Sequence, residues 1–119
     1  MTQEPIFDKQ DQLEKIEANL IEGEQLRAVF DMKGGGTGFL GITDKRLIFY
    51  DKAFMRKSKA MVTIPYSRII AIATKDPGGL FGSLSSELTI RTSGEAYEFE
   101  FRGGDKAHQA YNLIVPQIL

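Results

Sequence analysis

The stretch with the most distinct chemistry combines four cations with two large apolar side chains. Its members are Lys52, Phe54, Met55, Arg56, Lys57 and Lys59. This combination suits an anionic membrane surface or an acidic peptide. At about 1 kcal/mol per basic residue near an anionic leaflet, four cations supply about 4 kcal/mol, which corresponds to roughly millimolar binding. One copy is therefore a weak membrane binder, and several copies in a ring would bind usefully through avidity. The alternative interpretation is a solvated loop in which Phe54 folds back on the domain.

A glycine motif precedes this stretch. Residues 36–41 read Gly-Thr-Gly-Phe-Leu-Gly, which matches the pattern G-x-G-x-x-G. A dinucleotide site needs a helix directly after the motif, whereas the alternating apolar residues here predict a strand. A kinase-type glycine loop would be accompanied by H-R-D and D-F-G motifs, and neither is present. We therefore predict a hairpin loop, with Gly41 as a strand glycine that admits a close neighbour.

The remaining reactive residues form no recognisable catalytic set. The chain has no cysteine and one histidine, His108, so disulfides and a thiolate or histidine-rich zinc site are excluded. Glu98 and Glu100 alternate with aromatic residues, which indicates the solvated face of a strand. No nucleophile, base and orienting group occur together, so we predict a protein that is not an enzyme and has no cofactor or metal.

Composition limits the classes of protein further. The 119 residues are 42% hydrophobic and 26% charged, which is typical of one globular domain. A formal net charge of −1 argues against a general nucleic-acid binder. No apolar run approaches the roughly 18 residues that span a bilayer, and the opening residues lack the pattern of a signal peptide. We expect a cytoplasmic protein, with no small-molecule substrate indicated.

The central predicted element is a hairpin over residues 38–50, which turns at Thr43-Asp44-Lys45-Arg46. Its alternate apolar residues, Leu40 and Ile42 before the turn and Leu47 and Phe49 after it, predict one buried face.

Further elements follow from periodicity. Apolar residues spaced by three and four predict a helix over 8–21, with Asp8 as N-cap. Alternation predicts strands over 26–32, 62–64, 68–74, 87–91 and 97–102, and a last helix begins after Asp105. Pro116 is expected to kink or end that helix. About seven strands without intervening helices indicate antiparallel connections around one core. We therefore divide the chain into an N-terminal helix at 1–23 and a barrel domain at 24–119.

The predicted strand at 68–74 is apolar on both faces. We place Ile69, Ala71 and Ala73 on its outer face, as a candidate surface for self-association into a homo-oligomer. The N-terminal helix, whose apolar stripe is thin, either rests on the domain or packs on a second copy.

Several segments together resemble the bacterial pleckstrin-homology-like (PH-like) domains, in particular the YokE-like group. They are Gly23-Glu24, GFLGITDKRLIFY at 38–50, IPYSRI at 64–69, LTIRTSGEAYEFEF at 88–101, and the closing helix. The resemblance implies a mainly β fold (α+β), a bent antiparallel barrel of seven strands closed by a C-terminal helix.

For function, the resemblance implies a scaffold that serves lipid binding, peptide binding or self-assembly. Phosphoinositide-binding members of the wider superfamily carry basic residues on the two strands that flank their first loop, and residues 38–41 have none. We therefore predict a non-catalytic module that contacts a protein or an anionic membrane surface through loops of the barrel. The alternative is a structural, self-associating domain.

Overall fold

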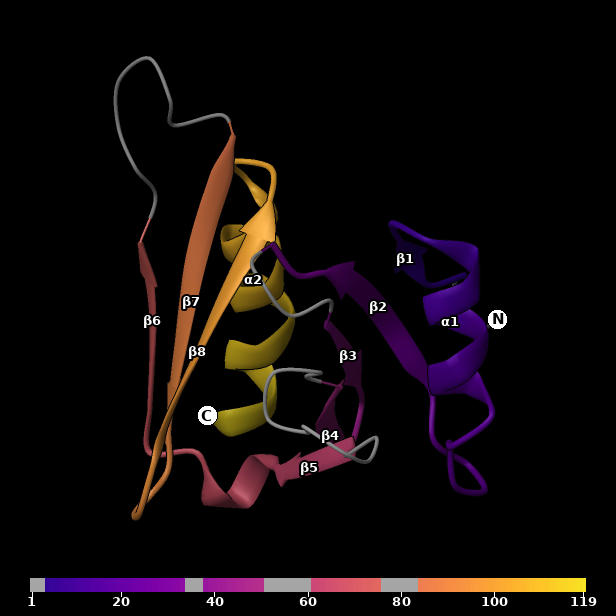
Figure 1. The fold of residues 1–119 in the computed structure, drawn as a ribbon. Coiled ribbons are helices and arrows are strands. Elements are labelled where there is room, and N and C mark those ends of the chain that lie inside the picture. Colours follow the sequence, from indigo (N-terminus) through magenta and orange to yellow (C-terminus); the bar gives the residue numbers. More distant parts are fainter. Residues whose placement is uncertain (1–3, 34–37, 51–60, 76–83) are drawn as a thin grey trace.

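The computed structural model describes residues 4–33, 38–50, 61–75 and 84–119, which form two β-sheets and two α-helices (Figure 1). The strands are β1 (Ile6–Phe7), β2 (Leu26–Asp31), β3 (Phe39–Thr43), β4 (Arg46–Tyr50), β5 (Met61–Pro65), β6 (Ala71–Lys75), β7 (Ser85–Arg91) and β8 (Ala96–Arg102). The helices are α1 (Gln10–Glu17) and α2 (Lys106–Ile118), and a 3₁₀ turn spans Tyr66–Arg68. This mainly β architecture with two helices agrees with the predicted fold class.

The predicted hairpin is the centre of a five-stranded sheet of order β1-β2-β3-β4-β5. Strands β3 and β4 pair antiparallel, with Leu40 opposite Phe49 and Ile42 opposite Leu47. All four side chains are buried in the main core, as the alternation predicts. The prediction that only one face of the hairpin is buried is wrong. The other face of the hairpin packs against α1 in a second apolar cluster. As a result, every residue of β3 is buried.

The second sheet has the order β6-β7-β8 and is entirely antiparallel. Leu88, Ile90, Phe99 and Phe101 face the core from this sheet, as predicted. Pro65 ends β5, and the following 3₁₀ turn leads the chain into the second sheet. An isolated antiparallel bridge joins Met32 to Phe101 at the other corner. The described strands thus form two sheets joined at corners and do not form one continuous barrel.

One pairing is parallel, which the sequence does not predict. Ile6 lies opposite Ala28 and Phe7 opposite Val29, so β1 runs in the direction of β2. A two-residue strand is too short to show alternation, and α1 provides the crossover that a parallel pair needs. The N-terminal segment is therefore part of the five-stranded sheet in this structure.

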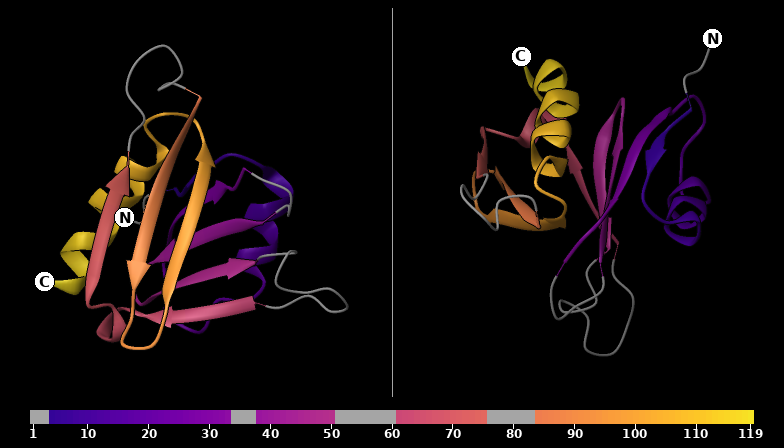
Figure 2. Two further views of the ribbon diagram at one scale, coloured as in Figure 1. Left: turned by 60° about the vertical axis from the view of Figure 1, so that its left-hand side comes forward. Right: turned by 90° about the horizontal axis from the view of Figure 1, so that it is seen from above.

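The two helices lie on opposite sides of the five-stranded sheet (Figure 2). Helix α2 lies between the sheets and closes the core through Ala107, Ala110 and Ile114. Asp105 occupies the predicted N-cap position but makes no side-chain capping hydrogen bond, and the Ala107 N–H donates to Ser86 Oγ at 2.9 Å. Pro116 lies in the last turn of the helix, which ends at Ile118, in agreement with the expected end near this proline. No helix in the described ranges is long and apolar enough to cross a membrane.

Helix α1 covers the outer face of β2 and β3, which is the first of the two alternatives that the sequence left open. It is shorter than expected and begins after Lys9, because Asp8 bonds the sheet and does not cap the helix. Leu13 and Ile16 are buried beneath it. A Cβ on Gly41 would lie 3.0 Å from Cδ1 of Ile16, so the glycine allows the helix to pack closely, as predicted.

Candidate functional site

The segments that carry the family resemblance meet at a buried ion pair. Arg46 donates two parallel hydrogen bonds to Glu24, from Nε to Oε2 at 2.8 Å and from Nη2 to Oε1 at 3.0 Å. The Thr43 hydroxyl donates to Oε2 of Glu24 at 2.7 Å. Tyr66 donates its hydroxyl proton to the backbone carbonyl of Thr43. Residues from the β2 entry, the β3–β4 turn and the β5 corner are therefore fastened to one another.

Electrostatics favour the charged form of this pair. Burial by itself would raise the pKa of Glu24. Hydrogen bonds from Arg46, the Ile21 backbone N–H and Thr43, together with the charge of Arg46, outweigh burial and lower this pKa from 4.5 to about 2. The hydrogen bonds with Glu24 outweigh burial and raise the pKa of Arg46. The carboxylate is thus ionised at neutral pH and fully engaged, so it is a structural group and not a general acid or base.

A second polar network fixes α1 and β8 to β2. Asp31 is buried and accepts hydrogen bonds from Gln12 Nε2 at 2.8 Å and Arg102 Nε at 2.9 Å. Its backbone N–H donates to Asp8, whose carboxylate lies 2.9 Å from Nζ of Lys106. These charges are paired with one another, with Asp31 buried and the Arg102 side chain exposed at the surface. Within the described ranges, no group of three or more carboxylates and histidines could hold a metal ion.

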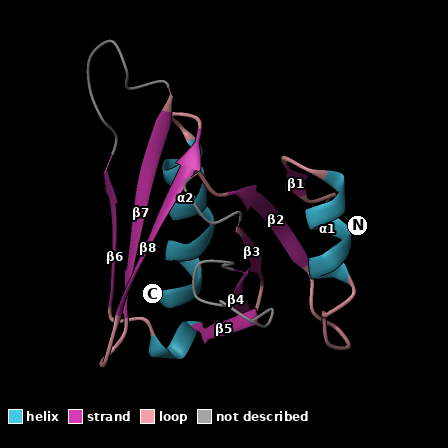
Figure 3. Cartoon of the chain, in the orientation of Figure 1, coloured by secondary structure: helices cyan, strands magenta, loops and turns pink. Residues whose placement is uncertain are grey.

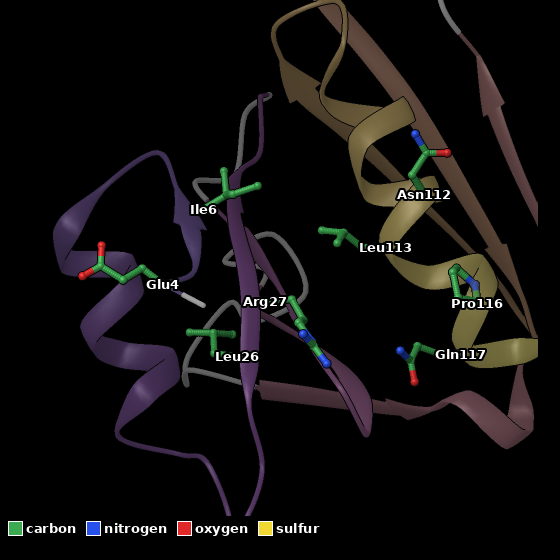
Figure 4. A pocket seen from close by; sticks show the side chains of 8 residues that line it. All are labelled: Glu4, Ile6, Leu26, Arg27, Asn112, Leu113, Pro116 and Gln117. Carbon is green, nitrogen blue, oxygen red and sulfur yellow. The ribbon is translucent and has the colours of Figure 1, made fainter. Parts of the chain in front are cut away.

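A groove of about 300 Å³ lies between the β1–β2 edge and the C-terminal half of α2. Its lining includes Ile6, Leu26, Arg27, Asn112, Leu113 and Gln117. Figure 4 shows Arg27, Leu113 and Gln117 pointing into the space between β2 and α2, while the carboxylate of Glu4 points away from α2. The groove thus combines one cation, two side-chain amides, apolar walls and one carboxylate, that of Glu4, which is directed away from α2.

A β-bulge explains why Arg27 faces this groove. Leu26 pairs with Thr43 and Ala28 with Ile42, so two steps along β2 match one step along β3 and Arg27 is the extra residue. The bulge places Leu26 in the α1 cluster with Val29 and leaves Ala28 in the main core. Arg27 is thereby turned toward α2. An unbroken strand, as predicted, would put Arg27 on the α1 side.

Of the predicted contact residues that the structure describes, Ile69, Ala71 and Ala73, none lines this groove. The basic stretch Lys52, Phe54, Met55, Arg56, Lys57 and Lys59 lies outside the described residues. The three candidate self-association residues are separated: Ala71 and Ala73 are exposed, whereas Ile69 is buried in the core. The prediction that Ile69 shares an outer face with Ala71 and Ala73 is therefore wrong. Strand β6 begins only at Ala71, so the alternation does not extend back through the corner, where Ile70 is the exposed isoleucine.

The other candidate reactive residues of the sequence, His108, Glu98 and Glu100, lie outside the groove. His108 is exposed and stacks on Tyr111, with ring centroids 6.1 Å apart. Glu98 is exposed on the outer face of β8, and Glu100 is half-buried. Figure 3 shows that this three-stranded sheet has α2 on its inner side only.

The groove residues were missed in the sequence for two reasons. Arg27 fits an alternating strand, and α2 is distant from β2 along the chain. One signal of the groove was present in the sequence: Asn112 and Gln117 are polar residues among the apolar residues of the C-terminal helix.

Comparisons with known proteins agree with this architecture. The model of the family described as bacterial PH domain matches residues 14–115. The uncharacterized protein YozO of Bacillus subtilis (strain 168) is 32% identical over 87 residues, which are 73% of this chain and 72% of that protein.

Two solved structures show the same fold. The pleckstrin homology domain from Shewanella amazonensis SB2B has a TM-score of 0.63 at 23% identity, covering 92% of this chain and 86% of that one. A DUF1696 family protein with a pleckstrin-homology domain from Shewanella loihica PV-4 has a TM-score of 0.65 at 20% identity, covering 94% and 95%.

Fold and comparisons therefore define a PH-like domain. More particularly, the chain belongs to the bacterial PH domain family.

Proposed function

We propose that this protein is a non-catalytic interaction module that contacts a protein or an anionic membrane surface. The observation that carries the proposal is that the buried charged side chains are bonded to neighbouring side chains and so stabilise the fold. Glu24 is bonded to Arg46, and Asp31 is bonded to Gln12 and Arg102. Among the described residues these groups serve the fold, and the turns and groove are left for contact.

A protein partner is the version that the described surface supports better. The groove between β2 and α2 has apolar walls and two side-chain amides, which suit a polypeptide. The membrane version depends on the cations of residues 52–59, whose combined attraction to an anionic leaflet is only about 4 kcal/mol. A cytoplasmic location stays a prediction.

Liposome co-sedimentation tests the membrane version. Vesicles of phosphatidylcholine with and without phosphatidylserine are compared at low salt, for the natural chain and for a variant with Lys52, Arg56, Lys57 and Lys59 changed to glutamine. The matched control changes four exposed cations elsewhere, Lys45, Arg68, Lys75 and Arg91, and so removes the same charge. Sedimentation that needs phosphatidylserine and is lost only in the first variant assigns a membrane partner. Its absence removes that version.

Photo-crosslinking in the cells of origin tests the protein version. A photo-reactive residue replaces Gln117 in the groove, Lys45 in the β3–β4 turn or Ser93 in the β7–β8 turn, all of which are exposed, and Glu98 on the outer sheet face serves as control. A discrete product at the groove or at a turn, absent at Glu98, supports the module. If neither lipid binding nor such a product is found, the proposed function is wrong.

Self-association is a second candidate, supported by the edge of the second sheet. Strand β6 is an edge strand, and Ala71 and Ala73 are exposed along it. Ile70, just before it, is 69% exposed. An apolar residue beside an open strand edge favours pairing with another copy. Light scattering at micromolar concentration measures the mass, and Ile70→Asp is expected to shift an oligomer toward monomer. A monomeric natural chain would contradict this candidate.

A further inference from the structure

We propose that the groove between β2 and α2 binds a carboxylate of a peptide segment, with an apolar neighbouring side chain seated beside it. Arg27 is the residue that pairs with the carboxylate. The inference rests on the proposed interaction role and names the chemistry that one site of the module recognises.

The first argument is the state of Arg27. Its side chain is half-buried at the floor of the groove, and within the described residues it makes no ion pair or side-chain hydrogen bond. In contrast, Arg46 pairs with Glu24 and Arg102 with Asp31. A guanidinium presents a planar fork of donors that matches a carboxylate in two parallel bonds. The groove therefore holds a guanidinium that forms no ion pair with a described carboxylate, although Glu4 also lines the groove.

The second argument is the bulge that delivers this side chain. In regular pairing Arg27 would point toward α1, and it still borders the cavity that Glu17 and Glu24 line. The extra residue in β2 turns its side chain to the α2 side, where the groove residues contributed by α2 are neutral and the carboxylate of Glu4 points away from α2 (Figure 4). Bulges that re-aim one side chain occur preferentially beside functional sites.

The third argument is the composition of the walls. Leu113 supplies apolar surface from α2, and Ile6, which is 49% exposed, extends it along β1. Asn112 and Gln117 supply amide donors and acceptors of the kind that pair with a peptide backbone. These features match a carboxylate and an apolar side chain joined by an amide.

The size of the groove limits the occupant. About 300 Å³ is at the lower end of ligand sites, so the groove accepts only one or two residues of a peptide.

The experiment uses short peptides and the natural chain labelled with ¹⁵N. Acetyl-Leu-Asp-amide carries a side-chain carboxylate, and acetyl-Leu-Asn-amide is its neutral control. Acetyl-Ala-Leu with a free terminal carboxylate is compared with its amide. Amide signals of Arg27, Leu113 and Gln117 are followed during titration. We expect saturable shifts with at least one carboxylate probe, at roughly millimolar affinity, and none with the neutral partner. The responding probe distinguishes an acidic side chain from a chain end.

Variants complete the test. Arg27→Met keeps the apolar stem and is expected to weaken binding by at least about tenfold, since it removes a charge-assisted pair. Arg91→Met, at an exposed position on β7, is the matched control and should bind as the natural chain does. The proposal is overturned if neither carboxylate probe shifts the groove signals, if the neutral probes bind equally, or if Arg27→Met leaves binding unchanged. Such a result leaves the crosslinking and liposome outcomes of the proposed function intact.

Discussion

Glu24→Gln is expected to destabilise the domain in a way that depends on pH. The substitution keeps the shape of the side chain and removes the charge that Arg46 meets at 2.8 Å. The gap between the ordinary pKa of 4.5 and about 2 corresponds to ~3 kcal/mol, at about 1.4 kcal/mol per pKa unit. Because the Arg46 side chain is 16% exposed, solvent screens part of the interaction, and we expect a loss of about 2 kcal/mol at pH 7.

The sign of the pH dependence follows from the lowered pKa of Glu24. The folded state holds the proton less tightly than the unfolded state, so the stabilisation is fully present above pH 4.5 and is lost as the pH falls toward 2. Protonated glutamate and glutamine are similar in shape and charge. The natural chain and the variant should therefore differ most at pH 7 and converge near pH 2.

Urea unfolding at a series of pH values measures this difference directly. The contribution of all other carboxylates cancels when the two proteins are compared at the same pH. Glu87→Gln, at an exposed position on β7, is the control and should change stability by less than about 0.5 kcal/mol. A difference that is constant with pH, or a loss no larger than that of the control, would refute the reasoning about this ion pair.

Three further predictions concern packing and the second network. Gly41→Ala should cost about 1–3 kcal/mol by thermal or urea unfolding, because the new methyl group would meet Ile16 at 3.0 Å, and a second change of Ile16 to Val should recover part of the loss. Asp31→Asn should cost about 1–3 kcal/mol, since Arg102 and Gln12 both donate to that carboxylate; an unchanged unfolding midpoint would contradict the role of the network. Ile114→Ala should cost about 2–5 kcal/mol, because the side chain is fully buried where α2 closes the core; a loss below about 1 kcal/mol would show that α2 is not the closing element.

Alternation in the sequence predicts the strands wherever a strand is long and regularly paired. Leu88 and Ile90 face the core because β7 and β8 pair without interruption over seven residues each. The same rule fails at Leu26 and at Ile69. At Leu26 a bulge inserts one residue and moves the side chain to the other cluster. Ile69 lies in a corner, where the period of two does not apply.

The candidate groove was beyond sequence reasoning for a related reason. It depends on the direction of one side chain after a bulge and on the contact between β2 and α2, and neither leaves a local pattern in the chain. The basic segment at 52–59, by contrast, is conspicuous in composition alone. Residues that stand out by type are therefore easy to propose, whereas those that converge through folding are not.

The ion pair of Glu24 and Arg46 also affects what a shared sequence signature means. The residues by which this chain resembles its family tie strand ends to a corner, and their polar groups are occupied by one another. Two proteins that share these residues thus share a way of folding, and they remain free to recognise different molecules. Inheritance of a partner should be judged at positions equivalent to Arg27 and Gln117, where a substitution would alter recognition and leave the scaffold unchanged.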